Sequence, residues 1–155
     1  MSCDAIAVSA LLWLASADPS AAAPPRLVFA SAPAAPPSVA GEPLFLDIVR
    51  RAGSLKTTVE AWRGQTGPLP GFDVFRGQLT ELSALDMQAH LLLAKRGTDG
   101  DLKCILRGIA QDLPVRLKEV ETAADDRARD QALKEMIWLL RDNVEVIEAP
   151  PRPAV

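Results

Sequence analysis

The chain contains a single histidine, His90, and imidazole is the side chain best suited to proton or phosphoryl transfer near neutral pH. His90 lies in the segment LDMQAHLLLAKRG, a few residues before Lys95 and Arg96. An imidazole nitrogen is a nucleophile, and the two cations would stabilise a bound phosphoryl group. Phosphotransfer through His90 is therefore one candidate function, whereas catalysis or metal binding built on several imidazoles is excluded.

A helical bundle that carries phosphate on one histidine would resemble the histidine phosphotransfer domains. Their pattern usually places a lysine and a glycine three and four residues after the histidine. Leu93 and Ala94 occupy these two positions here, so the resemblance rests on one residue and on a fold class that many functions share. The alternative, which this departure favours, is that His90 is a packing residue at the boundary of an apolar helix face.

The cysteines and the acidic residues show no pattern of a catalytic or metal site. Cys3 and Cys104 are far apart and form neither a disulfide framework nor a zinc motif, and Cys104 is expected to be a buried structural thiol. The acidic residues are expected on solvated helix faces, with none inside an apolar stripe. The pairs concerned are Glu81 with Asp86, Glu119 with Glu121, and Asp142 with Glu145.

A carboxylate metal site in a helical bundle needs acids that point inward, commonly with a Glu-x-x-His motif. The chain has no such motif, and it has no phosphate-binding loop, nucleophile elbow, HExxH or CxxC motif. We therefore predict no metal, no cofactor and no enzymatic activity.

Length and composition narrow the possible partners. The 155 residues suggest one domain, and 48% of them are apolar, which is enough for a substantial core. The net charge of −3 disfavours nucleic acid as a partner, since nucleic-acid binding usually needs a basic patch. No window approaches the ~18 uninterrupted apolar residues of a membrane-spanning helix, so no integral membrane span is predicted. Another protein, or a second copy of the chain, is the expected partner.

Residues 1–41 carry few charges and many Ala and Pro residues, and they include the apolar run 5–17, AIAVSALLWLASA. This run is either an arm that packs on the domain or on a partner through Trp13, or the core of a secretory signal removed as residues 1–17 or 1–23. No Lys or Arg precedes the run, which disfavours a signal. We therefore predict a cytoplasmic protein, with a periplasmic or secreted protein as the alternative.

Residues 18–41 have the Ala/Pro composition of an extended linker that supplies little to pack. Leu27, Val28 and Phe29 interrupt this linker with three consecutive apolar side chains. They form a second candidate partner-binding motif in the N-terminal region. At the other end of the chain, residues 149–155 are predicted to be a disordered tail.

Between these regions, apolar residues recur at spacings of three and four, which is the pattern of helices with one buried face. Turns rich in Gly and Pro separate the segments. Thr122 and Asp125 have the spacing of a capping box, and Asp73 is expected to cap the second helix. The predicted helices are Pro43–Arg63, Asp73–Arg96, Asp101–Glu121 with a kink at Pro114, and Asp125–Glu148.

Four amphipathic helices with short connections predict an all-α, antiparallel up-down four-helix bundle at residues 42–148. A mostly disordered N-terminal arm of residues 1–41 precedes the bundle, and the tail of residues 149–155 follows it. Trp138 and Leu139 lie off the main apolar face of the last helix. Such residues are either covered by the N-terminal arm or used to bind another molecule.

We therefore predict a non-enzymatic protein-interaction module, which is a regulator, an adaptor or a secretion-linked factor. An exported helical protein and a phosphotransfer protein that uses His90 are the alternatives. The candidate contact residues are Trp13, Leu27, Val28, Phe29, Trp138 and Leu139.

Overall fold

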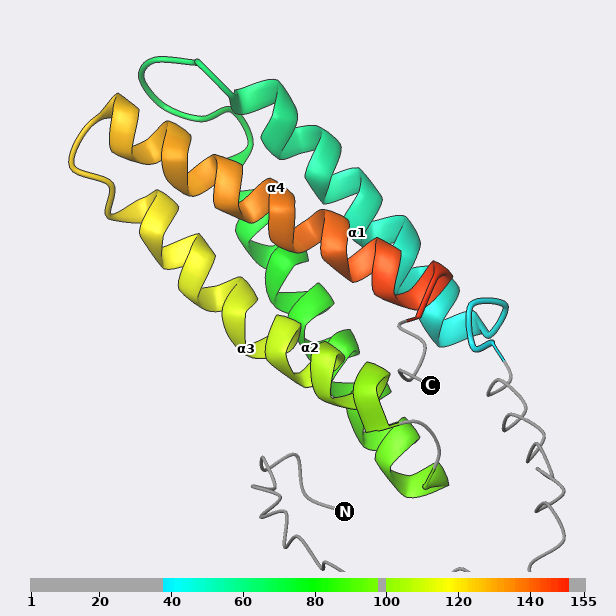
Figure 1. Ribbon diagram of the computed structural model, residues 1–155. Helices are drawn as coiled ribbons and strands as arrows, with labels where there is room; N and C mark the ends of the chain where they lie inside the picture. The colour runs from blue at the N-terminus through cyan, green and yellow to red at the C-terminus, as the bar shows by residue number, and fades with distance from the viewer. Residues whose placement is uncertain (1–37, 98–99, 151–155) are drawn as a thin grey trace, which may run out of the picture. The chain divides into compact units, whose positions relative to one another are not determined.

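The computed structural model describes residues 38–97 and 100–150, and these residues form four α-helices without a strand (Figure 1). Each helix packs against its neighbours along the chain, and the last helix closes the bundle against the first. Successive helices run in opposite directions, so the predicted antiparallel up-down four-helix bundle is confirmed. The helices are α1 (Pro43–Trp62), α2 (Phe72–Arg96), α3 (Gly100–Glu121) and α4 (Asp126–Glu148).

Each predicted helix boundary lies within one residue of the observed boundary. Pro43 opens α1, where its missing N–H costs nothing, and Gly64 follows the end of α1 with a φ of 73°. The division of the chain at residues 41 and 148 stays a prediction, because the expected arm and tail lie almost entirely outside the described residues.

Two predicted helix caps are wrong. The residue before α2 is Gly71, at a φ of 71°, and Asp73 lies in the first turn instead of capping it. Asp125, not Thr122, caps α4, because its carboxylate accepts a hydrogen bond from the Ala128 amide at 2.7 Å. Thr122 instead bonds back to Lys118 at the end of α3, where its hydroxyl donates to the carbonyl at 2.8 Å.

The core consists of apolar side chains that recur every three or four residues on all four helices. The apolar spacing of the sequence predicts Leu44, Leu85 and Val144 on the buried stripes, but the buried positions are shifted by one residue. Leu44, Leu85 and Val144 are only half-buried, whereas their chain neighbours are fully buried. Those neighbours are Phe45, Asp86 and Asn143, each 0% exposed. Two polar residues therefore occupy core positions.

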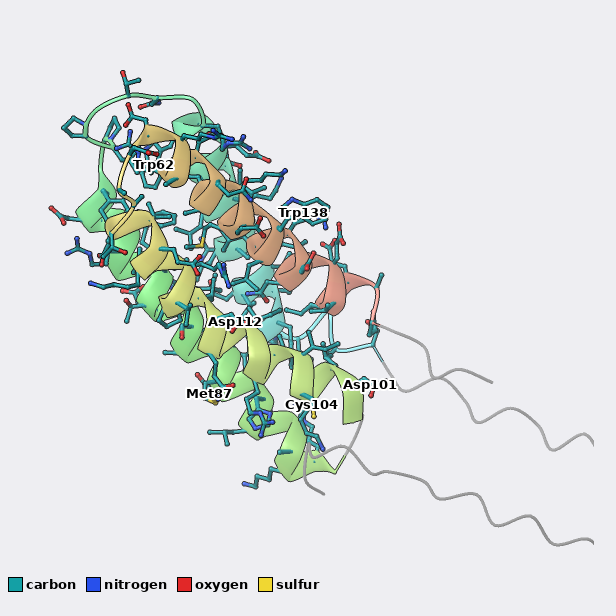
Figure 2. All side chains as sticks on the ribbon, turned by 60° about the vertical axis from the view of Figure 1, so that its left-hand side comes forward. Trp62, Met87, Asp101, Cys104, Asp112 and Trp138 are labelled. Atoms are coloured by element: carbon teal, nitrogen blue, oxygen red, sulfur yellow. The ribbon has the colours of Figure 1, made fainter. Side chains whose placement is uncertain are left out.

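An aromatic cluster fixes the connection between α1 and α2. The Trp62 ring centroid lies 5.8 Å from that of Phe72 and 4.8 Å from that of Phe75. The Trp62 indole N–H donates to the Pro70 carbonyl at 3.2 Å, so the buried ring keeps a polar partner. Figure 2 shows Trp62 at the end of the bundle where this connection lies.

Two bidentate ion pairs join helix ends. Arg63 contacts both carboxylate oxygens of Asp130 at 2.6 and 2.8 Å, and the Gly64 amide donates to the same carboxylate at 3.1 Å. Near the opposite end, Arg96 contacts both oxygens of Glu42 at 2.7 Å. The paired geometry makes these contacts stronger than single exposed ion pairs. One pair ties α1 to α4 and the other ties α2 to the start of α1.

Pro114 lies inside α3 without ending it, as the continuing stripe predicted. A proline has no N–H, so the carbonyl of Ala110, four residues earlier, loses its usual helical donor. The Ser83 hydroxyl on α2 donates to this carbonyl at 2.7 Å. Ser83 therefore satisfies a buried acceptor on the neighbouring helix and links α2 to α3.

Replacement of Ser83 by alanine should destabilise the bundle by about 1–3 kcal/mol, because it leaves the Ala110 carbonyl without this donor. Urea denaturation measures the loss. In the Pro114→Ala background the helix regains its own N–H donor, so the same Ser83→Ala change should cost less. Equal costs in the two backgrounds would contradict this role for Ser83.

Candidate functional site

Trp138 lies on the outward face of α4, with 48% of its surface exposed (Figure 2). The Arg141 guanidinium lies 3.8 Å from the centroid of the indole ring, which is a close cation–π contact. Arg141 in turn contacts Glu145 at 3.3 Å and Asp142 at 3.1 Å. Leu139, the next residue, is half-buried and packs against the core. The two candidate contact residues on α4 thus have different surroundings.

The other candidate contact residues cannot be compared with the structure. Trp13, Leu27, Val28 and Phe29 all lie outside the described residues. Their proposed role in binding a partner stays a prediction.

His90 is half-buried and connects α2 to α3. Its Nδ1 lies 2.8 Å from the Lys103 carbonyl oxygen. A carbonyl only accepts, so Nδ1 carries the hydrogen in this bond. This contact gives His90 a packing role between two helices, while phosphotransfer through Nε2 stays a prediction.

Cys104 is half-buried on α3 and does not carry a free thiol. The expectation of a buried thiol at this position is therefore wrong. No group of three or more His, Cys, Asp or Glu side chains in residues 38–97 and 100–150 is placed to hold a metal ion. None of the helices in this part of the chain is long and apolar enough to cross a membrane.

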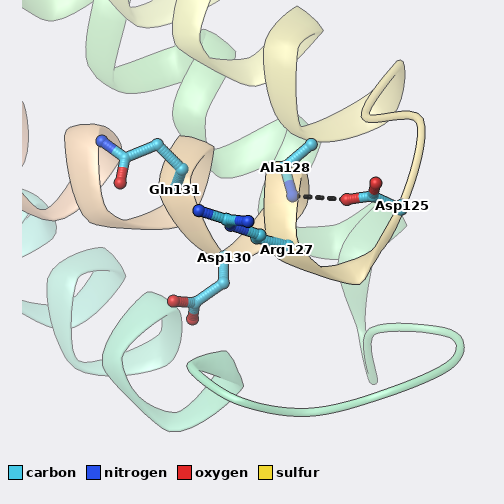
Figure 3. Close-up of a pocket in the computed structure, with 5 residues that line it drawn as sticks. All are labelled: Asp125, Arg127, Ala128, Asp130 and Gln131. Carbon is cyan, nitrogen blue, oxygen red and sulfur yellow. Dashed lines mark hydrogen bonds between the residues drawn. The ribbon is translucent and has the colours of Figure 1, made fainter.

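A shallow hollow of about 500 Å³ lies at the start of α4 (Figure 3). Its two acids already have structural partners. Asp125 accepts from the Ala128 amide, and Asp130 forms the ion pair with Arg63. Both carboxylates are therefore engaged in structural contacts. The residues that line the hollow are Asp125, Arg127, Ala128, Asp130 and Gln131.

Sequence reasoning missed the polar pair in the bundle core, Asp86 on α2 and Asn143 on α4. Both residues are 0% exposed, and the Asn143 amide donates to Asp86 Oδ2 at 2.8 Å. The expectation that no apolar stripe contains an acid is therefore wrong. The pair spans the bundle between two helices that are not neighbours. We call Asp86 and Asn143 the core pair.

The core pair has too few donors for its acceptors. Asp86 Oδ1 and Asn143 Oδ1 are both buried, and neither has a hydrogen-bond partner. A buried acceptor without a partner costs free energy, and an unpaired buried charge costs more. Burial raises the pKa of Asp86 to about 8, although the hydrogen bond from Asn143 acts in the opposite direction. Burial therefore favours the neutral carboxylic acid at Asp86 near neutral pH.

A positional signal for both residues was present in the sequence. Asp86 follows Leu82 by four residues and precedes Ala89 by three, so it lies on the apolar stripe of α2. Asn143 similarly follows Leu140 by three residues and precedes Ile147 by four. The position alone would have identified both residues, but Asp86 was expected on a solvated face because it is an acid, and Asn143 was not considered.

Comparisons with protein families, with curated proteins and with solved structures find no match to this chain. The exposed Trp138 and the core pair are the features of the described residues from which we infer a function.

The free energy of unfolding should fall as pH rises from about 4 to about 8. Asp86 binds a proton in the folded state, with a pKa of about 8, and releases it in the unfolded state, where the pKa is the ordinary 3.8. Four pKa units at 1.36 kcal/mol each give a loss on the order of 5 kcal/mol. Urea denaturation at a series of pH values measures it.

Asp86→Asn keeps the shape of the side chain and removes the titration, so its stability should exceed that of the wild type increasingly as pH rises. Asp112→Asn, a change at an exposed acid on α3, should keep the wild-type slope. Arginine partners lower the pKa of Glu42, Asp47 and Asp130. These carboxyls therefore change the free energy of unfolding only at acidic pH. A wild type and an Asp86→Asn variant with parallel pH profiles would contradict the assignment.

Proposed function

We propose that the chain is a non-enzymatic protein-interaction module, and that the outward face of α4 around Trp138 contacts another protein or a second copy of the chain. The observation that carries this proposal is the exposure of Trp138, 48% of whose surface is open on a helix face that points away from the core. Trp62, the tryptophan of the core, is by contrast only 3% exposed.

The surroundings of Trp138 support a binding role. Tryptophan and arginine are the residues that most often dominate the energy of protein interfaces, and here Arg141 stacks on Trp138. Burial of the exposed half of an indole is worth roughly 2–3 kcal/mol at about 25 cal/mol per Å². The neighbouring Asp142 and Glu145 provide a charged rim around one apolar anchor.

The hollow at the start of α4 also favours binding over catalysis. A catalytic carboxylate needs to reach substrate, but the two acids of this hollow are engaged in a helix cap and an ion pair. The polar groups of the core pair lie in the interior, away from any substrate outside the closed bundle.

Two alternatives remain proposals. Phosphotransfer through His90 is supported by the bond from Nδ1 to the Lys103 carbonyl, which leaves Nε2 as the ring nitrogen outside this contact. An exported protein is supported by the apolar run of residues 5–17, which lies outside the described residues.

Trp138→Ala should weaken association tenfold or more, as expected from the loss of ~1.4 kcal/mol or more of interface energy. Sedimentation velocity measures self-association. Association with another protein is measured by the binding of the variant to a protein first captured on the wild-type chain. Urea denaturation should show a loss of stability below about 1 kcal/mol, because the side chain lies outside the core.

Leu91→Ala is the matched control, since Leu91 is 60% exposed on α2 and lies on a different face of the bundle. This change should leave association intact. An equal effect of the two substitutions would argue against the α4 face as the contact surface. A Trp138→Ala variant that loses stability without losing association would instead make Trp138 a structural residue.

A further inference from the structure

We propose that Asp86 enters the folded bundle as a carboxylic acid, and that release of its proton separates α2 from α4 around the core pair. The bundle then contains a proton-dependent contact at its centre, which opens the apolar interior as pH rises. This proposal does not depend on the role of Trp138.

The first support is the place of the core pair in the fold. The backbones of α2 and α4 lie diagonally across the bundle and make no contact in the described residues. The side chains of Asp86 and Asn143 span this diagonal through a hydrogen bond of 2.8 Å. Because both side chains are fully buried, the bond is formed only while the bundle is closed.

The second support is the balance of donors and acceptors. With Asp86 ionised, Asn143 Nδ2 donates to Asp86 Oδ2, while Asp86 Oδ1 and Asn143 Oδ1 have no donor. A proton on Asp86 Oδ1 turns that oxygen from an acceptor into a donor and removes the buried charge. The proton is taken from water on closing and returns to water on opening.

The third support is that no charged group among the described residues pairs with Asp86. Only burial and Asn143 shift the pKa of Asp86. The ion pairs on the surrounding helices join other groups, such as Arg51 with Glu81 and Arg141 with Asp142. A carboxylate at this position would therefore have no cationic partner. The charged and titratable groups on the surrounding helix segments are Asp47 and Arg51 on α1, Glu81 and His90 on α2, Lys103 and Arg107 on α3, and Arg141 and Asp142 on α4.

An ionised Asp86 gains most from contact with water, which requires the helices to separate locally. The Arg63–Asp130 and Arg96–Glu42 ion pairs hold helix ends together. Opening is therefore expected in the middle of the bundle, at the turns of α2 and α4 that carry the core pair, before the ends separate.

Amide hydrogen exchange of the full chain tests the proposal between about pH 6 and about pH 9, after correction for the intrinsic pH dependence of exchange. Protection at residues 82–89 and 140–147 should fall about tenfold or more in the wild type. In Asp86→Asn, which cannot release a proton, protection should stay constant. Asp112→Asn should behave as the wild type.

A variant that replaces both polar groups, Asp86→Leu with Asn143→Leu, covers the case in which Asp86→Asn does not fold. Apolar residues of similar volume often stabilise a core in place of a buried polar pair, so this variant should fold and show pH-independent protection. Constant protection in the wild type would overturn the proposal. An equal fall in protection in the wild type and in the Asp86 variant that folds would overturn it as well.

Discussion

The hydrogen bond from the Asn143 amide to the Asp86 carboxyl crosses an interior that is otherwise apolar. In such surroundings a polar contact is strong when it is complete and costly when it is incomplete. It also sets the register of the two helices that carry it. A shift that moved Leu85 or Val144 into the core would leave a polar side chain without its partner. The four apolar stripes provide the energy of folding, and the core pair favours one arrangement of them.

Two further polar contacts satisfy backbone groups that the helices leave open. Ser83 donates to the Ala110 carbonyl, from which Pro114 removes the usual donor. Asp125 accepts from an N–H group that the start of α4 leaves open. Each contact meets a local requirement of the backbone, and the partly buried Ser83 bond also joins two helices.

The helices and their arrangement were predictable from the sequence because apolar spacing, Pro43 and Gly64 are local signals. The core pair was not predicted because the spacing rule considers apolar residues alone. The rule therefore selected Leu85 and Val144, although Asp86 and Asn143 occupy the more central positions. The cost of burying Asp86 is offset by Asn143, which is 57 residues away in the chain. Local spacing contains no information on that partner.

The place of Trp138 off the main face of α4 indicated that it lies outside the core, but it did not indicate the contact with Arg141. Residues three apart on a helix are neighbours, so the spacing allowed the contact without requiring it. The same limit applies to His90, whose boundary position was predicted while its bond to Lys103 depends on how α3 packs.

The central claim is that Asp86 is a neutral acid in the folded bundle, and its ionisation can be observed directly. Carbon-13 NMR of the Asp86 side-chain carboxyl, assigned by comparison with Asp86→Asn, follows the protonation of this group alone. We expect a titration midpoint near pH 8. A midpoint near the ordinary value of about 4 would show that Asp86 is ionised in the core and would rule out a neutral acid there.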